Sequence, residues 1–265
     1  MPNFITKIIG KYAALRLLDV KRKYLPSTKD KAIVEEEIED HKNRKIFYGS
    51  FVKQNDLCFD VGANVGNRII PLLELGAKVI AVEPQDYCVK YLNHKFGDKI
   101  TIVNKGLGET ESIKDFYISN LSVLSSFSED WINSVKNSRF KAYSWNKVVK
   151  MEMTTLDNLI SKYGKPTFIK IDVEGYETEV LKGLTQPVKM ISFEYTVPEQ
   201  TIKAIQCLEL INKFNKQIEC NYSVGESMIY NLSSWLSFEQ MKQHVQTQAF
   251  LNTNFGDVYV RSKNK

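Results

Sequence analysis

Short apolar runs and helical patterns alternate along the middle of the chain. Helical patterns at 67–76 and 85–97 each follow such a run. Buried strands that alternate with helices form a parallel sheet covered by helices, so the pattern predicts an α/β fold. The apolar runs, which we expect to be the strands, occupy residues 57–61, 78–82, 99–104, 166–173 and 188–195.

The N-terminal segment carries two helical patterns. Apolar residues recur at helical spacing over 3–20, and a second pattern, rich in Glu and Lys, covers about 29–47. Pro26 breaks the first helix. The first helix has two interpretations, contact with a membrane surface or partner, and packing on the following domain. We expect residues 1–45 to form a helical extension.

The pattern of the C-terminal segment predicts which strands complete the sheet. Residues 217–224 and 256–262 have the pattern of a closing antiparallel pair of strands, with a helix at 237–246 between them. A chain of 265 residues, 43% hydrophobic, can bury one full core, and a second complete domain is not expected. We therefore expect residues 46–265 to form one α/β domain.

Two segments in the middle of the chain each leave two interpretations open. In the serine-rich loop, Ser125 and Ser126 face a cleft, or Ser128 simply caps the helix that follows. Basic and aromatic residues interleave over 139–150, a pattern of nucleic-acid or sugar contacts and also of ordinary surface insertions. Residues 105–110 are expected to form a turn beside the cleft.

The turn after the first apolar run indicates a ligand site. It reads DVGANVG from Asp60 to Gly66, and its glycines allow a tight turn and close approach of a ligand. Asp60 and Glu83 end adjacent parallel strands, where open α/β sheets bind ligands. An acid inside the turn repels a pyrophosphate and attracts a sulfonium and an amino group, while Glu83 suits two ribose hydroxyls. Charge therefore favours S-adenosylmethionine over NAD, with a tight turn without ligand as the third interpretation.

The overall composition adds few constraints. A formal net charge of +5 permits contact with nucleic acid or anionic lipid but argues for neither. The four cysteines are scattered without a C-x-x-C pair, as in reduced cytosolic proteins, and no zinc site is expected. No uncharged apolar run reaches 18 residues, so we expect no transmembrane helix and a cytoplasmic protein.

Four motifs occur in the order DVGANVG, AVEP, TTLDNLI and KIDVEGYETEVLKGL. As an ordered set they resemble the FkbM-type S-adenosylmethionine-dependent methyltransferases, from Phe47 to Tyr195 and more weakly at GDVYVR. The resemblance implies a class I methyltransferase fold, a seven-stranded, mostly parallel sheet with an antiparallel last strand. It also implies S-adenosylmethionine as cofactor and O-methylation of sugars or other small hydroxylated metabolites.

The resemblance also implies which residues bind the cofactor. Gly106 stands where the family has alanine, beside the expected adenine wall. The partner implied is a small-molecule or glycan hydroxyl acceptor, with no DNA expected and a homo-oligomer left open. Carried over by position, the cofactor-binding residues are Asp60, Gly62, Ala63, Asn64, Gly66, Glu83, Pro84, Asn104, Gly106 and Leu107.

Carboxylates at the ends of the fourth and fifth strands are the candidates for catalysis. Lys170 and Asp172 fall on one side of the fourth strand, and a buried charge needs a partner. Because an alcohol must lose its proton, we expect Asp172 or Glu174 to be the general base. Glu194 is expected to position the acceptor, and Lys170 to pair with a carboxylate or hold the acceptor oxygen.

Structural roles remain open for the same residues. Lys170 and Asp172 are equally compatible with a structural ion pair, and Glu174 with a role at the positive end of the following helix. The carboxylates of Asp172, Glu174 and Glu194 have the hardness that Mg²⁺ prefers, but their spacing does not demand a metal and we expect none. The three histidines lie in predicted helices and are expected at the surface.

Three other functions compete with methyl transfer to a small metabolite. An NAD-dependent oxidoreductase requires a third early glycine and no acid in the turn, and the chain meets neither requirement. A non-catalytic S-adenosylmethionine-binding scaffold is disfavoured by the acids at four strand ends. A 2′-O-methyltransferase acting on RNA is disfavoured by the modest charge and the lack of a continuous basic face.

Overall fold

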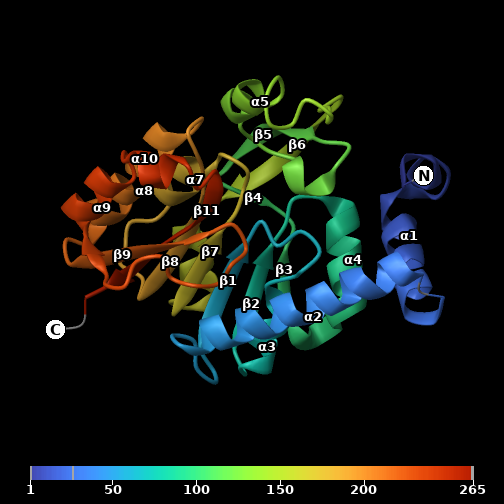
Figure 1. Ribbon diagram of the computed structural model, residues 1–265, viewed down its shortest axis with the longest axis horizontal. Helices are drawn as coiled ribbons and strands as arrows, with labels where there is room; N and C mark the ends of the chain where they lie inside the picture. Colours follow the sequence, from blue (N-terminus) through green and yellow to red (C-terminus); the bar gives the residue numbers. More distant parts are fainter. Residues whose placement is uncertain (1, 26, 264–265) are drawn as a thin grey trace.

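The main sheet has eight strands and is mostly parallel. Its strands are β1 Leu57–Val61, β2 Lys78–Val82, β3 Thr101–Val103, β7 Phe168–Ile171, β8 Met190–Thr196, β9 Ile218–Val224, β10 Leu236–Ser237 and β11 Phe255–Ser262. The computed structural model describes residues 2–25 and 27–263, and Figure 1 shows them. The strand order is β10-β9-β11-β8-β7-β1-β2-β3. β11 runs antiparallel to β8 and β9, whereas β3, β2, β1, β7 and β8 are parallel.

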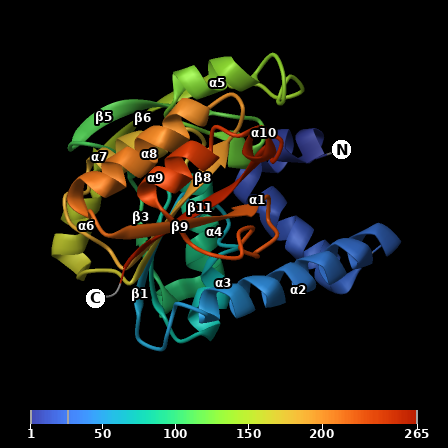
Figure 2. The same ribbon diagram turned by 60° about the vertical axis from the view of Figure 1, so that its left-hand side comes forward.

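Helices cover both faces of this sheet (Figures 1 and 2). The helices are α2 Thr28–Gly49, α3 Ile69–Glu74 and α4 Asp86–Phe96 on one face, and α6 Leu156–Tyr163, α7 Glu177–Lys182, α8 Thr201–Phe214, α9 Phe238–His244 and α10 Gln248–Leu251 on the other. Successive side chains of a strand point to opposite faces, so Phe59 joins one core and Cys58 the other. The α/β expectation is confirmed.

The number of strands differs from the seven that we expected. The additional strand is β10, whose two residues pair with the edge of β9, Leu236 opposite Cys220. The closing antiparallel pair, β9 and β11, is confirmed. Sequence patterns did not show that β11 would insert between β8 and β9, because hydrophobic alternation carries no information on strand order.

A second, three-stranded sheet lies beside the carboxyl ends of the main strands. Its strands are β4 Gly106–Leu107, β5 Ser112–Ile118 and β6 Lys147–Thr154, in the order β4-β6-β5. The plain turn predicted over 105–110 is therefore wrong at Gly106 and Leu107, which pair with Met153 and Thr154 of β6. This pairing fixes one wall of the cavity described below.

The interleaved aromatic and basic segment at 139–150 has a packing role. Phe140 and Trp145 pack against the fully buried Trp131 of α5 (Glu129–Val135). The indole nitrogen of Trp145 donates a hydrogen bond to the carbonyl oxygen of Leu124 at 2.5 Å. These contacts favour the surface-insertion interpretation of this segment.

The N-terminal helix α1 (Pro2–Tyr24) packs on the domain through α4. The Tyr91 hydroxyl donates a hydrogen bond to Asp19 at 2.7 Å, and Lys11 Nζ donates one to the carbonyl oxygen of Ser119 at 2.9 Å. Pro26 lies outside the described residues, while Ser27 is the N-cap of α2 and forms a capping box with Asp30. These contacts support the packing interpretation of the first helix.

The structure gives the character of the helices and the positions of the cysteines and histidines. None of the helices in the described part of the chain is long and apolar enough to cross a membrane. The cysteines Cys58, Cys88, Cys207 and Cys220 are all buried and free. The histidines lie in α2, α4 and α9, as predicted.

Candidate active site

A cavity of about 310 Å³ opens at the carboxyl ends of β1, β2, β7 and β8. This is the edge at which open α/β sheets bind ligands, and the volume is at the lower end for small-molecule sites. Of the predicted site residues, those that line the cavity are Asp60, Gly62, Ala63, Asn64, Glu83, Pro84, Gly106, Leu107, Asp172, Glu174 and Glu194. Gly66, Asn104 and Lys170 do not line it.

Two glycines of the turn have different functions. Gly62 has a φ of +85°, and a Cβ there would come within 1.7 Å of the carbonyl oxygen of Asp172. The turn can therefore lie against the end of β7 only with glycine at this position. Gly66 also has a positive φ, but its Cβ would meet the ring of Phe96 at 2.5 Å. Gly66 is thus required for packing against α4.

Glu83 connects the glycine turn to the segment after β2 by hydrogen bonds. Its Oε2 accepts a hydrogen bond from the Asn64 N–H and its Oε1 one from the Gln85 N–H, both at 2.8 Å. Burial raises the pKa of Glu83 to about 7, although these two bonds act in the opposite direction. Asn104 Nδ2 donates to the carbonyl oxygens of Glu83 and Pro84, both at 3.1 Å. Asn104 therefore supports the site from outside the cavity.

Asp60 is a buried acid with one oxygen unused. Its side chain is 2% exposed, and Oδ2 has no hydrogen-bond partner in the described part of the chain. Burial raises the pKa of Asp60 to about 6, while Arg68 and Lys170 act to lower it. A buried acid of this kind is stabilised by a cationic ligand group, since an unpartnered buried charge is costly.

Lys170 pairs with two carboxylates beneath the cavity. Its Nζ lies 2.6 Å from Asp257 Oδ1 and 3.2 Å from Asp172 Oδ2, and its side chain is 1% exposed. Burial alone would lower the pKa of Lys170, but the charges of Asp172 and Asp257 raise it above its ordinary value. Lys170 thus holds Asp172 by an ion pair and does not itself line the cavity.

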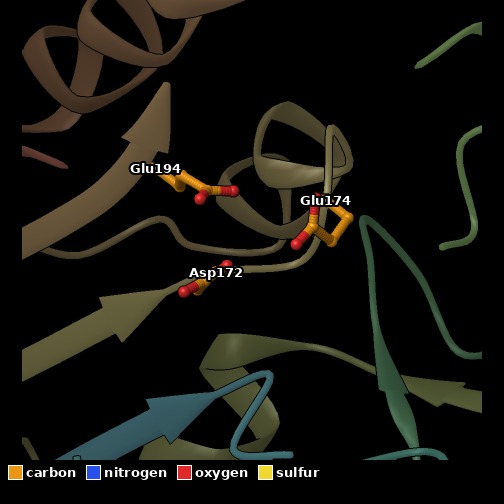
Figure 3. A group of neighbouring side chains, drawn as sticks. All are labelled: Asp172, Glu174 and Glu194. Carbon is orange, nitrogen blue, oxygen red and sulfur yellow. The ribbon is translucent and has the colours of Figure 1, made fainter. Parts of the chain in front are cut away.

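Three carboxylates converge in the cavity at the carboxyl ends of β7 and β8. One oxygen each from Asp172, Glu174 and Glu194 lies within 4.8 Å of the others, and Figure 3 shows these side chains together. Burial and then the charge of Asp172 raise the pKa of Glu174 and Glu194 well above the ordinary carboxylate range. Carboxylates this close can share protons with a ligand or supply oxygen ligands to a divalent cation.

Glu177 shapes the loop that carries Glu174. Its Oε1 accepts hydrogen bonds from the N–H groups of Val173 and Gly175, both at 3.1 Å. Glu174 has a φ of +55°, in the left-handed region. The Ser126 hydroxyl donates to the carbonyl oxygen of Glu174 at 2.7 Å. The loop is therefore held from both sides by polar side chains.

The two interpretations of the serine-rich loop are both partly correct. Ser125 lines the cavity, while Ser126 contacts the Glu174 loop. Ser128 accepts a hydrogen bond from the Trp131 N–H at 3.1 Å and caps α5. 

Five residues that the sequence did not indicate take part in the site. Asp257 is 87 residues from its partner Lys170, and no local pattern relates the two. Gln85 follows AVEP directly, and its position beside Glu83 was the available signal. Arg44, Arg68 and Glu226 also line the cavity and come from three separate segments.

Comparison with known proteins identifies the family. Residues 60–224 match the family described as the methyltransferase FkbM domain. The chain belongs to this FkbM methyltransferase family. Its relative AglP, a hexuronic acid methyltransferase from Haloferax volcanii, is 24% identical over 143 residues, covering 53% of this chain and 55% of AglP. This chain thus spans about half the length of this curated relative.

Solved methyltransferase structures are also similar. Precorrin-6y C5,15-methyltransferase from Geobacter metallireducens is 10% identical to this chain, with a TM-score of 0.43; the match covers 83% of this chain and 86% of the Geobacter chain. An S-adenosylmethionine-dependent O-methyltransferase from Thermotoga maritima is 11% identical, with a TM-score of 0.39; the match covers 83% of this chain and 65% of the Thermotoga chain.

Family membership confirms the resemblance and its main implications. The sheet, with β11 antiparallel next to a parallel core, is the class I methyltransferase arrangement with β10 added. The cofactor of the FkbM family is S-adenosylmethionine, and the unpaired oxygen of Asp60 fits its cationic end. The family does not by itself assign roles to single residues.

Proposed function

We propose that this protein transfers a methyl group from S-adenosylmethionine to a hydroxyl of a sugar, glycan or other small metabolite. The observation that carries the proposal is that two groups of acids line one cavity. Asp60 and Glu83, at the carboxyl ends of β1 and β2, form the first group, and Asp172, Glu174 and Glu194, at the carboxyl ends of β7 and β8, form the second. The first group suits a cationic nucleoside, and the second suits a hydroxyl that must lose a proton. The parts of the cavity lined by the two groups are named the cofactor end and the acceptor end.

The cofactor end fits its ligand residue by residue. Bound there, S-adenosylmethionine supplies a methyl group activated by a positive sulfur. Asp60 faces the cationic methionyl group, and Glu83 keeps lone pairs free for the ribose hydroxyls after binding two backbone N–H groups. Gly106 and Leu107, fixed by β6, form the wall for the adenine.

The acceptor end supplies the base. Asp172 or Glu174 takes the hydroxyl proton, and Glu194 holds the acceptor oxygen or its neighbour. A raised pKa makes a carboxylate a stronger base near neutral pH, and such general-base catalysis contributes about 10²- to 10⁴-fold. The half-buried positions of the three acids restrict water, and positioning of the acceptor contributes further.

The acceptor class is supported by the curated relative. AglP is named for hexuronic acid, a sugar derivative, which agrees with a sugar or glycan acceptor here.

Ligand binding can be tested before the acceptor is known. At about 100 times its Kd, S-adenosylhomocysteine should stabilise the fold by about 2.7 kcal/mol, a Tm increase of roughly 5–10 °C. The same concentration of NAD should leave the Tm unchanged. Stabilisation by NAD alone, measured by differential scanning fluorimetry, would overturn the proposal. Methyl transfer from radiolabelled S-adenosylmethionine to a panel of sugars then tests the reaction.

Binding should also release protons near pH 6. The pKa of Asp60 is about 6 in the free protein, and a ligand ammonium beside it lowers that pKa. Protonated Asp60 therefore ionises on binding at pH 6, whereas at pH 8 it is already ionised. Titration calorimetry with S-adenosylhomocysteine in buffers of different ionisation enthalpy measures the release. The release should be smaller in Asp60→Asn, and equal release in that variant would contradict the assignment.

A further inference from the structure

Two arginines meet at Glu226 in the wall of the cavity. Arg44 comes from α2 and Arg68 precedes α3, and both side chains are 11% exposed. Both line the cavity together with Glu226, which follows β9. None of these three residues belongs to the cofactor or acceptor contacts proposed so far.

Arg44 and Arg68 offer more N–H donors than the neighbouring carboxylates offer acceptor oxygens. Glu226 Oε2 lies 2.6 Å from Arg68 Nη2 and 3.4 Å from Arg44 Nη2, so one carboxylate, itself 49% exposed, is shared by two guanidinium groups. Asp40 is a second partner of Arg44, with its Oδ2 3.4 Å from Arg44 Nη2. Arg68 Nη1 and Arg44 Nε are buried and have no partner among the described residues. Buried polar groups without partners are uncommon, so these donors suit a further acceptor.

Arg68 also lies near an acid with an unused oxygen. Asp60 Oδ2 has no partner in the described chain, and Arg68 is the neighbouring charge that most lowers the pKa of Asp60. Asp60 and Arg68 flank the same glycine turn, eight positions apart. The cavity wall therefore presents an anion and a cation near each other, which complements the ammonium and carboxylate of a free α-amino acid group.

We propose that Arg68, assisted by Arg44, binds the α-carboxylate of the methionyl group of the cofactor, while Asp60 faces its ammonium. Guanidinium groups match carboxylates in shape and charge. Glu226, already bound by both arginines, shows that the pair accommodates a carboxylate at this place. The inference rests on the proposed cofactor and adds that the N-terminal extension, through Arg44, recognises it.

Two ligands that differ in the amino acid group test the proposal. S-Adenosylhomocysteine carries the carboxylate and the ammonium, whereas 5′-methylthioadenosine has the same nucleoside without either. In Arg68→Gln, the Kd of S-adenosylhomocysteine should rise about 10- to 100-fold and that of 5′-methylthioadenosine less than about threefold. Arg44→Gln should show a smaller change in the same direction. Isothermal titration calorimetry gives both constants for each variant.

Further variants keep the test decisive. Glu226→Gln removes a competing carboxylate, so the ratio of the two Kd values should shift in favour of S-adenosylhomocysteine. Arg68→Lys keeps the charge and should retain part of the preference if Arg68→Gln fails to fold. Lys45→Gln, on the same helix but paired with Glu74 outside the cavity, is the control and should bind both ligands as wild type does.

Three outcomes would overturn the inference. Equal weakening of both ligands in the arginine variants would show a structural role only. Unchanged S-adenosylhomocysteine binding in both variants would place the carboxylate elsewhere and leave the proposed function intact. Wild-type protein that bound neither nucleoside would overturn the proposed function and this inference together.

Discussion

Asp172→Asn is expected to lower kcat by about 10²- to 10⁴-fold while the Kd of S-adenosylhomocysteine changes less than about fivefold. Asp172 lies in the group of three acids at the acceptor end, and Lys170 holds it at 3.2 Å. The amide keeps the shape of the side chain but cannot accept a proton. Glu174→Gln and Glu194→Gln are expected to lower kcat as well. The base is identified as the residue whose amide variant loses the most activity, and the positioning residue should lose less.

The pH profile gives an independent test of the same group. A base must be deprotonated to act, so activity falls as the pH falls through the pKa of that base. Because burial and Asp172 raise the pKa of Glu174 and Glu194, the acid limb in the wild type should lie above the ordinary carboxylate range. Asp172→Asn removes one charge that raises these pKa values. The acid limb of its residual activity should therefore move to lower pH.

A matched variant controls for surface charge. Asp115, on β5, forms an exposed ion pair with Lys150 away from the cavity, and Asp115→Asn should retain wild-type kcat and pH profile. If all three amide variants in the acid group turned over at the wild-type rate, the catalytic assignment would be wrong. 

Lys170→Met is expected to destabilise the fold by about 3–5 kcal/mol. The substitution leaves Asp257, whose side chain is 4% exposed, without its partner at 2.6 Å. A buried charge that loses its partner retains the full cost of desolvation. Urea unfolding followed by circular dichroism measures the change in free energy of unfolding.

Two further variants distinguish the loss of a buried ion pair from the loss of any lysine ion pair. Lys182→Met removes an exposed pair with Glu179 and should cost about 0–1 kcal/mol. Lys170→Met/Asp257→Leu removes both buried charges and should be more stable than the single Lys170→Met variant. A single variant as stable as the wild type would mean that the pair contributes nothing to the fold.

Sequence reasoning predicted those parts of the site whose signals are local. The turn around Gly62 and the acid at Glu83 each follow directly from an apolar run, so their place at the strand ends could be predicted. Alternation along one strand put Lys170 and Asp172 on the same side, and their ion pair confirms it. Each of these predictions uses residues that are close in the sequence.

The parts that were missed depend on contacts between distant segments. Asp257 faces Lys170 only because β11 inserts next to β8, and alternation does not show strand order. Arg44 reaches the cavity because α2 packs beside α3, so a residue of the presumed extension became part of the site. The pairing of Gly106 with Met153 likewise depends on a second sheet that the sequence did not indicate as such.

The position of β11 links the completion of folding to the assembly of the acceptor end. β11 follows β8 and β9 in sequence yet lies between them, so the two cannot join into one sheet before residues 255–262 insert. β11 also supplies Asp257, the nearer of the two carboxylate partners of Lys170. Until β11 is in place, Lys170 therefore lacks this partner, and the group of ion pairs that holds Asp172 is incomplete.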